Sequence, residues 1–300
     1  MPPLKNQFSA GIGFGLAAFS LFSLLPIYLQ WLQPISGYTV LYHRILWSSV
    51  LLLIVLGLLG KLKENLKPLM QIKQWPGLLL GSGLIAIQWG VFVWAPLNEQ
   101  TLELSLGYFL MPLIMVFIGK VFYRETLRPL QWAALLLATI GVSFSYVESQ
   151  GLSLVVLLII TGYPCYLMLR RHQVLPTFSA FLIENLILLP FAIIGIVLFG
   201  GLEGESLQHP FAYEWTWLLL FLGVAILGSA PMLCFIAANK RLPMSVLGLV
   251  SYVEPTLIFL VAYFLLGESL STQEVITYSF ISAGLVLTLI DGIREIKKPK

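Results

Sequence analysis

The chain has 300 residues, of which 58% are hydrophobic and 10% are charged, and its mean hydropathy is +0.91. Soluble domains typically carry about 25% charged residues, so this composition excludes a soluble globular enzyme, a disordered chain and a nucleic-acid-binding protein. The net charge of +3 is therefore no sign of a nucleic-acid partner; the positions of the Lys and Arg residues instead indicate the membrane topology. The two cysteines, Cys165 and Cys234, stand alone in apolar runs and suit neither a metal site nor a disulfide framework.

Ten apolar segments are each long enough to cross a hydrocarbon core of about 30 Å at 1.5 Å per residue. The first is too long for a signal-peptide core and has no cleavage site after it, so it is also interpreted as a membrane helix. Short connections predict that neighbouring helices are antiparallel. The expected fold is an all-α integral membrane protein with ten transmembrane helices. They cover about residues 8–31, 37–60, 74–95, 101–122, 128–147, 151–171, 178–200, 215–238, 243–265 and 272–291.

The positions of the basic residues test this topology. With the N-terminus in the cytoplasm, all of the 17 Lys and Arg residues fall in cytoplasmic segments except Arg44 and Lys120, which lie within helices. The long loop over residues 201–214 on the other side carries acidic residues and no Lys or Arg. This asymmetry follows the positive-inside rule. It predicts cytoplasmic N- and C-termini in the cell inner (cytoplasmic) membrane.

An internal repeat appears when the sequence is shifted by 143 residues. The third to fifth helices then align without a gap to the eighth to tenth. The expected units are a first five-helix repeat over 1–147, a second over 151–291 and a basic cytoplasmic tail over 292–300. Five is odd, so the repeats cross the membrane in opposite senses, an inverted arrangement that many secondary transporters use. The alternative is that the repeat arose by gene duplication and has no role in transport. The clearest matches pair Pro112 with Pro255, Glu125 with Glu268, and Gly141 with Gly284.

Several sequence runs resemble a known family. The runs S-L-G-Y-F-L-M-P-L from Ser105, G-K-V-F-Y-R-E-T-L from Gly119 and S-Y-V-E-P-T-L from Ser251 resemble the EamA family of the drug/metabolite transporter superfamily. The runs H-R-I-L-W from His43 and L-I-E from Leu182 resemble its RarD-like subfamily in particular. The resemblance covers nearly the whole chain. It implies ten helices in two repeats and a central cavity lined by the first, third, fourth, sixth, eighth and ninth helices. It also implies export as the direction of transport.

Polar and aromatic side chains within the apolar spans are the candidate substrate-binding residues, because polar groups in hydrocarbon are costly. Glu254 stands directly before Pro255, which interrupts the helical hydrogen bonds. A carboxylate there suits a cavity wall that takes a proton or binds an ammonium group; a protonated structural Glu is the alternative. Aromatic residues with a polar tip suit amphipathic solutes, although packing is the alternative for each one. The candidate set is Gln88, Trp89, Tyr108, Met111, Tyr163, Tyr166, Tyr252 and Glu254, and the helix kinks are expected at Pro112, Pro164, Pro231 and Pro255.

Charged residues inside the spans are candidates for proton coupling or gating. Arg44 lies near the outer face, beside His43, and Glu184 lies near the inner face. Arg44 and Glu103 are predicted to lie at similar depths in the membrane and could therefore form a pair. The same is true of Glu184 and Lys120. Such pairs act either as gates that break alternately or as static braces, and braces are the favoured interpretation. The full set is Glu254, Glu184, Arg44, His43, Glu103 and Lys120.

Motifs for other functions are absent from the sequence. It has no G-x-x-x-x-G-K-[ST] loop for ATP, no H-E-x-x-H metal motif and no G-x-S-x-G nucleophile elbow. We therefore expect a secondary transporter without catalytic residues, cofactor or metal. It would move small organic solutes, amino acids or related metabolites, across the lipid bilayer by alternating access. Proton exchange and downhill flow both stay open. The alternatives are a proton-coupled drug or antibiotic efflux pump, a solute importer and, less favoured, a membrane-embedded enzyme.

Overall fold

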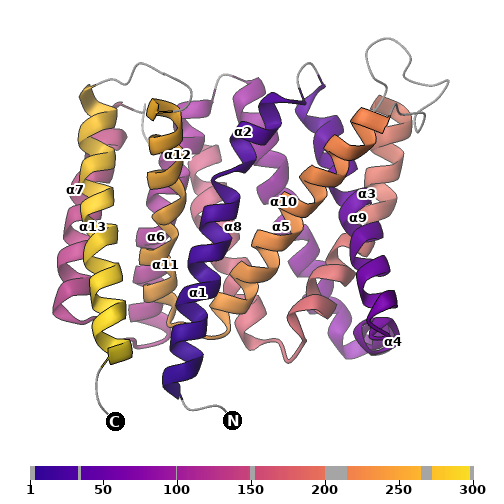
Figure 1. Cartoon of the computed structure of the whole chain (residues 1–300), viewed down its shortest axis with the longest axis horizontal. Coiled ribbons are helices and arrows are strands. Elements are labelled where there is room, and N and C mark those ends of the chain that lie inside the picture. Colours follow the sequence, from indigo (N-terminus) through magenta and orange to yellow (C-terminus); the bar gives the residue numbers. More distant parts are fainter. Residues whose placement is uncertain are drawn as a thin grey trace.

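The computed structural model describes residues 4–32, 35–98, 100–148, 153–199, 215–264 and 272–297, and the regular structure within these ranges is entirely helical. Long helices stand side by side in a bundle (Figure 1). The elements are α1 (Leu4–Phe22), α2 (Leu25–Gln30), α3 (Gly37–Leu58), α4 (Leu62–Leu66), η1 (Lys67–Met70), η2 (Ile72–Gln74), α5 (Trp75–Leu97), α6 (Thr101–Phe122), α7 (Pro129–Glu148), α8 (Leu154–His172), α9 (Thr177–Phe199), α10 (Trp215–Asn239), α11 (Met244–Ser251), α12 (Val253–Phe264) and α13 (Thr272–Lys297).

Nine spans in the described part of the chain are long and apolar enough to cross a membrane. This confirms the expected all-helical integral membrane class. The tenth expected span corresponds to α7, which has 20 residues but whose apolar stretch, Pro129–Phe144, is shorter than the others. Helix α7 packs along α13 at one edge of the bundle (Figure 1). The count of ten membrane-crossing helices therefore stays a prediction.

One end of the bundle collects basic side chains. Helix α8 ends in Arg170, Arg171 and His172, and Lys240 and Arg241 follow α10. Helix α1 begins at this end and α13 finishes there (Figure 1). We call it the basic end, and the other end the opposite end.

Two of the predicted spans are interrupted by prolines. The segment expected over 8–31 is divided into α1 and α2 at Ser23–Leu24, just before Pro26 in the first turn of α2. The segment expected over 243–265 is divided into α11 and α12 at Tyr252, just before Pro255. Proline has no backbone N–H to continue the helical ladder, which explains both interruptions. By contrast, Pro112, Pro164 and Pro231 lie inside the continuous helices α6, α8 and α10.

Helices whose residues are 143 positions apart make reciprocal contacts. Helix α5 packs against α8 and α9, whereas α10 packs against α1 and α3. Helices α7 and α13 show the same reciprocity where their backbones come close together. A Cβ at Gly141 would lie 2.9 Å from the carbonyl oxygen of Thr277, and a Cβ at Gly284 would lie 2.9 Å from the carbonyl oxygen of Ala134. Gly141 and Gly284 are 143 apart, and so are Ala134 and Thr277. The same glycine-to-backbone contact is thus made twice between α7 and α13.

Alanine at either of these glycines should destabilise the protein by a similar amount. Because the added methyl group would meet a backbone carbonyl that cannot rotate away, we expect Gly141→Ala and Gly284→Ala each to cost about 1–3 kcal/mol. Thermal unfolding of the detergent-solubilised protein measures the effect. Gly83→Ala is the matched control, since nothing lies within 4 Å of a Cβ there. A loss confined to one of the two glycines would contradict the reciprocal packing.

Candidate solute-binding cavity

A cavity of about 200 Å³ lies between the helices. It takes side chains from α1, α2, α3, α5, α6, α8, α10, α11, α12 and α13, and thus includes every helix that the family resemblance implied. Leu104 and Ser105 from the first turns of α6, together with Leu25 and Pro26 of α2, belong to its wall. These turns lie at the opposite end of the bundle (Figure 1). The cavity therefore extends toward the end of the bundle away from the basic end.

Aromatic rings form a continuous chain along the wall. The Tyr108 ring lies edge-on to Phe92 at a centroid distance of 6.1 Å, and 6.5 Å from the Tyr163 ring. The Tyr163 ring in turn meets Phe235 edge-on at 6.3 Å. These four residues come from α6, α5, α8 and α10. Rings at such spacings attract one another, so they hold the wall in place and present an apolar surface to a solute.

Part of the wall consists of residues 143 positions apart. Three such pairs line the cavity: Phe92 with Phe235, Tyr108 with Ser251, and Met111 with Glu254. The charges of the wall do not follow this pairing. Glu254 corresponds to the neutral Met111, and Arg44 corresponds to Ile187, which is not in the wall. The positions of the wall are thus partly paired between the halves, whereas the charges are not.

Arg44 is the cationic residue of the wall. Its side chain comes from α3 and is only 8% exposed. Its guanidinium carbon lies 4.2 Å from the centre of the Trp89 ring, a cation–π contact. On the side of α10 it lies against Gly228, where any Cβ would overlap the guanidinium. Its hydrogen bond from Nη2 to the Gly228 carbonyl oxygen is long at 3.4 Å. Among the described residues, no carboxylate lies within ion-pair distance of Arg44.

Glu254 is the acidic residue of the wall. It stands in the first turn of α12, two residues after the interruption at Tyr252. Its side chain is half-buried, and it interacts electrostatically with Tyr108 and Tyr163. Within the described part of the chain its carboxylate has no hydrogen-bond or ion-pair partner. The cavity therefore contains one basic and one acidic side chain that form no ion pair with the other described residues.

The predicted substrate-binding residues divide into two groups. Trp89, Tyr108, Met111, Tyr163 and Glu254 line the cavity. The other three are buried between helices, where each makes a hydrogen bond. Gln88 Nε2 donates to the Leu158 carbonyl oxygen at 2.6 Å, Tyr166 Oη to Glu184 Oε2 at 2.9 Å, and Tyr252 Oη to the Phe109 carbonyl oxygen at 3.0 Å.

Other wall residues were not singled out from the sequence. Phe19, Phe22, Phe235 and Tyr278 also line the cavity. Aromatic residues of an apolar helix look alike whether they face lipid or a cavity, so hydropathy contains no signal for them. The one available signal concerned Phe235, which lies 143 residues after Phe92.

The predicted gating residues have partners other than those that depth suggested. Glu184 forms an ion pair with Arg170 of α8 rather than with Lys120. The Lys120 side chain is exposed and lies over the Trp132 ring at 4.1 Å. Neighbouring antiparallel helices explain the difference, because α8 and α9 are joined by a short connection that brings Arg170 beside Glu184.

The pair expected between Arg44 and Glu103 is likewise absent from the described part of the structure. Glu103 Oε2 is buried without a hydrogen-bond partner among the described residues. His43, beside Arg44, is fully buried, and its ring stacks on Phe221 with 4.0 Å between the centroids. Of the six gating candidates, Arg44 and Glu254 are those that line the cavity.

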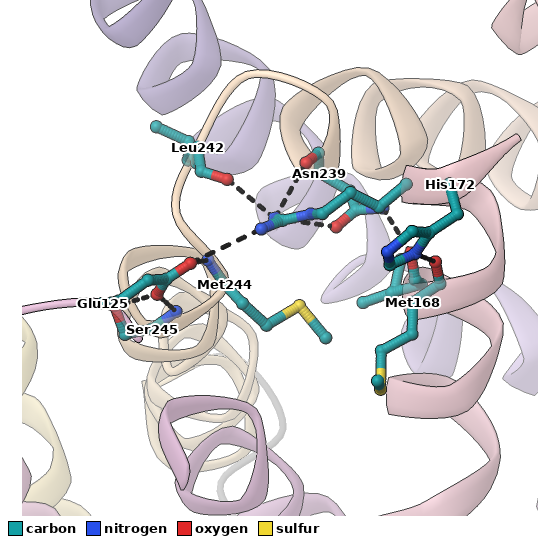
Figure 2. Close-up of polar contacts among 9 residues, drawn as sticks. Glu125, Met168, His172, Asn239, Leu242, Met244 and Ser245 are labelled. Atoms are coloured by element: carbon teal, nitrogen blue, oxygen red, sulfur yellow. Dashed lines mark hydrogen bonds and ion pairs between the residues drawn. The ribbon is translucent and has the colours of Figure 1, made fainter. Parts of the chain in front are cut away.

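At the basic end, a polar cluster ties four segments together (Figure 2). The carboxylate of Glu125 accepts hydrogen bonds from the backbone N–H of Met244 at 2.7 Å and of Ser245 at 2.9 Å, and from Ser245 Oγ at 2.6 Å. Arg171 Nη1 lies 3.5 Å from Glu125, and its Nη2 donates to the carbonyl oxygens of Asn239 and Leu242. A carboxylate at the first N–H groups of α11 is stabilised by the helix dipole. We call Glu125, Arg171, Asn239, Met244 and Ser245 the basic-end clasp.

Lys240 extends the contacts beside the clasp. Its ammonium group donates to the carbonyl oxygen of Leu175, which joins the end of α10 to the connection before α9. Burial, with nearby Arg170 and Arg241, lowers the pKa of Lys240. The described residues are therefore tightly joined at the basic end, away from the cavity.

Comparisons with known proteins agree with this architecture. Residues 9–147 match the EamA-like transporter family. The chain is 37% identical over 295 residues to "Chloramphenicol-sensitive protein RarD" of Pseudomonas aeruginosa, with 96% of each chain covered. It is 34% identical over 288 residues to "Uncharacterized transporter YojE" of Bacillus subtilis (95% of each) and 32% identical over 289 residues to "Protein RarD" of Escherichia coli (96% of each).

A solved structure described only as "Crystal structure of protein" shares the fold, with a TM-score of 0.69 at 18% identity; the match covers 95% of this chain and 98% of the other. The helical bundle and the names of the relatives point to a multi-pass membrane transporter rather than an enzyme. The chain belongs to the EamA family of the drug/metabolite transporter superfamily and is RarD-like within it.

Proposed function

We propose that the protein is a secondary transporter of the cell inner membrane that exports small organic solutes, amino acids or related metabolites, by alternating access. The observation that supports this most is the cavity itself: its wall is largely aromatic, it contains Arg44 and Glu254 without ion-pair partners among the described residues, and it includes residues 143 positions apart. A solute held there would contact both halves of the chain. Its binding would then be coupled to their relative movement.

Alternating access requires two states that open to different sides. The proposed units are two inverted five-helix repeats over 1–147 and 151–291, with α7 as the tenth span and the tail 292–300 in the cytoplasm. The reciprocal packing of α5 and α10 and the doubled contact between α7 and α13 support this division. The cavity lies toward the opposite end while the clasp joins the basic end, so this structure fits the state that receives or releases solute at the opposite end. Exchange of the two repeat conformations would produce the other state.

The direction and the energy source rest on further observations. The basic end would be cytoplasmic by the positive-inside rule, and the family resemblance favours export. Glu254 is the candidate proton carrier because its carboxylate lines the cavity without a partner among the described residues. Proton-coupled drug efflux is the second candidate function, and the largely aromatic wall favours it. Import is the third.

Solute counterflow in liposomes that contain only this protein tests the proposal. Liposomes preloaded with unlabelled L-phenylalanine should accumulate the labelled amino acid faster than protein-free liposomes, with saturation. A proton-coupled carrier should respond to an imposed pH gradient, and Glu254→Gln should lose that response while the protein is still made at normal levels. Absence of saturable flux for amino acids, nucleosides and antibiotics alike would contradict the transport function. Product formation without flux would indicate an enzyme.

Loss of the Tyr108 ring should weaken solute binding. Tyr108 contacts the rings of both Phe92 and Tyr163 in the cavity wall, so Tyr108→Ala removes a central part of the apolar surface. We expect the half-saturation concentration to rise about tenfold, which corresponds to about 1.4 kcal/mol. Tyr146→Ala is the control, since its side chain is 47% exposed and outside the wall. An unchanged half-saturation concentration would assign Tyr108 to helix packing.

A further inference from the structure

Two opposite charges face one cavity, and neither is neutralised by another side chain of the described residues. We propose that Arg44 binds the carboxylate of the transported solute and Glu254 binds its ammonium group, so that the solute is a zwitterionic α-amino acid with an apolar side chain. This inference rests on the proposed transport function and assigns the two ends of the solute to α3 and α12.

The surroundings of Arg44 leave its donors available for a carboxylate. One side of the guanidinium lies against Trp89, and the backbone of α10 at Gly228 lies close enough to exclude a Cβ. A guanidinium has five N–H donors, and the 3.4 Å contact with the Gly228 carbonyl oxygen is longer than a good hydrogen bond. A buried arginine held in this way is prepared for a bidentate bond to a carboxylate.

The surroundings of Glu254 suit an ammonium group. Its carboxylate accepts no hydrogen bond from the described residues. Pro255 has no N–H, so it cannot donate to the carbonyl oxygen of Ser251 one turn earlier. Ser251 also lines the cavity. An ammonium group has three donors, and this wall therefore offers it an anionic acceptor next to a backbone carbonyl that the helix does not use.

The cost of unpaired charge explains why one solute should satisfy both residues. A charge held away from water is unfavourable unless it is paired. A carboxylic acid without an amine would neutralise Arg44 alone, and an amine without an acid would neutralise Glu254 alone. A zwitterion neutralises both, and its side chain can pack on the ring chain of Phe92, Tyr108 and Tyr163. The volume of about 200 Å³ lies below the roughly 300–1,000 Å³ usual for drug-sized ligands, which favours a small solute.

Three related probes test the assignment in equilibrium binding to the purified full-length protein. L-Phenylalanine has both groups, L-phenylalaninamide lacks the carboxylate, and 3-phenylpropanoate lacks the ammonium. The native protein should bind L-phenylalanine about 10- to 100-fold more tightly than either analogue, as expected for losing one charge-assisted contact. Arg44→Gln should abolish the preference over the amide but keep the preference over 3-phenylpropanoate. Glu254→Gln should do the reverse.

Ratios of affinities within one variant separate recognition from folding, because a misfolded fraction lowers the binding of all three probes alike. Arg44→Lys, which keeps the charge but loses the planar fork, should show an intermediate ratio and replaces Arg44→Gln if that variant binds no probe. Lys63→Gln and Glu64→Gln remove matched charges outside the cavity and should keep both ratios. Equal binding of the three probes to the native protein would overturn the inference. So would a change of both ratios by either cavity variant.

Binding and flux distinguish the failure of this inference from failure of the proposed function. Saturable counterflow of an uncharged solute, combined with equal binding of the three probes, would retain the transporter and overturn the roles of Arg44 and Glu254. The predicted ratios without counterflow of any solute would retain the binding assignment and overturn the proposed transport.

Discussion

Replacing Glu184 with alanine should lower the free energy of unfolding by about 3–5 kcal/mol. The side chains of Glu184 and Arg170 are each only 1% exposed, and they form an ion pair between α9 and α8. Tyr166 also donates to Glu184, at 2.9 Å. The substitution leaves the Arg170 cation buried without its counter-charge, which is the costly step. Unfolding by heat or denaturant in detergent micelles measures the loss.

The double variant Arg170→Met/Glu184→Leu separates the cost of an unpaired charge from the value of the pair. Because it removes both charges and keeps much of the volume, it should recover most of the stability. Equal losses in the single and double variants would show that packing around the pair matters more than charge. Flux in the double variant distinguishes the two interpretations of the pair. A brace predicts near-native transport for each folded molecule, whereas a gate predicts that transport is lost.

Replacing Glu125 with alanine should release the basic end. Glu125 caps α11 through Met244 and Ser245 and meets Arg171 (Figure 2), so its loss removes several charge-assisted hydrogen bonds together. If the clasp holds this end closed, the equilibrium should shift toward the state open at the basic end by about 2 kcal/mol, roughly 30-fold. A cysteine introduced at the buried Met244 in a background without Cys165 and Cys234 reports the opening through its rate of labelling by a thiol reagent.

The control for this experiment makes the same change of charge but leaves the clasp intact. Glu64→Ala removes an exposed acidic residue of α4, and labelling at position 244 should not change. Glu125→Gln keeps an oxygen acceptor and should lie between the native protein and Glu125→Ala. A lower melting temperature without faster labelling would restrict Glu125 to capping α11.

The two interrupted helices show where local patterns stop being informative. Hydropathy placed the spans over 37–60 and 178–200 close to α3 and α9, because a run of apolar residues needs no knowledge of its neighbours. Hydropathy averaged over a window does not detect a single proline such as Pro26, so α1 and α2 were predicted as one span. Pro255 was predicted as a helix kink, together with Pro112, Pro164 and Pro231, because proline lacks the N–H that continues the helical hydrogen bonds. Residues on both sides of each interruption line the cavity: Phe22 and Leu25 at the first, and Ser251 and Glu254 at the second.

Residues of the same chemical type lie in different environments, and the packing of their helix against the others decides which. Tyr108 and Tyr252 are both tyrosines within apolar spans, yet Tyr108 lines the cavity and Tyr252 donates to a backbone carbonyl of α6. Trp89 lines the cavity, while its neighbour Gln88 turns to α8. Successive residues of a helix point about 100° apart. Which of them reaches the cavity depends on the rotation of each helix against the others.

The amino-acid sequence by itself determined that this protein is a bundle of apolar helices, that most of its basic residues would gather at one end, and that positions 143 apart correspond, since these properties follow from composition and spacing along the chain. Only the tertiary structure decided which charges pair. It joined Glu184 to Arg170, joined Glu125 to α11, and left Arg44 and Glu254 in the cavity without ion-pair partners among the described residues. The physical reason is that an ion pair depends on distances of a few ångströms between side chains of different helices. The hydropathy pattern gives only the position of each residue along its own span, and hence its depth in the membrane.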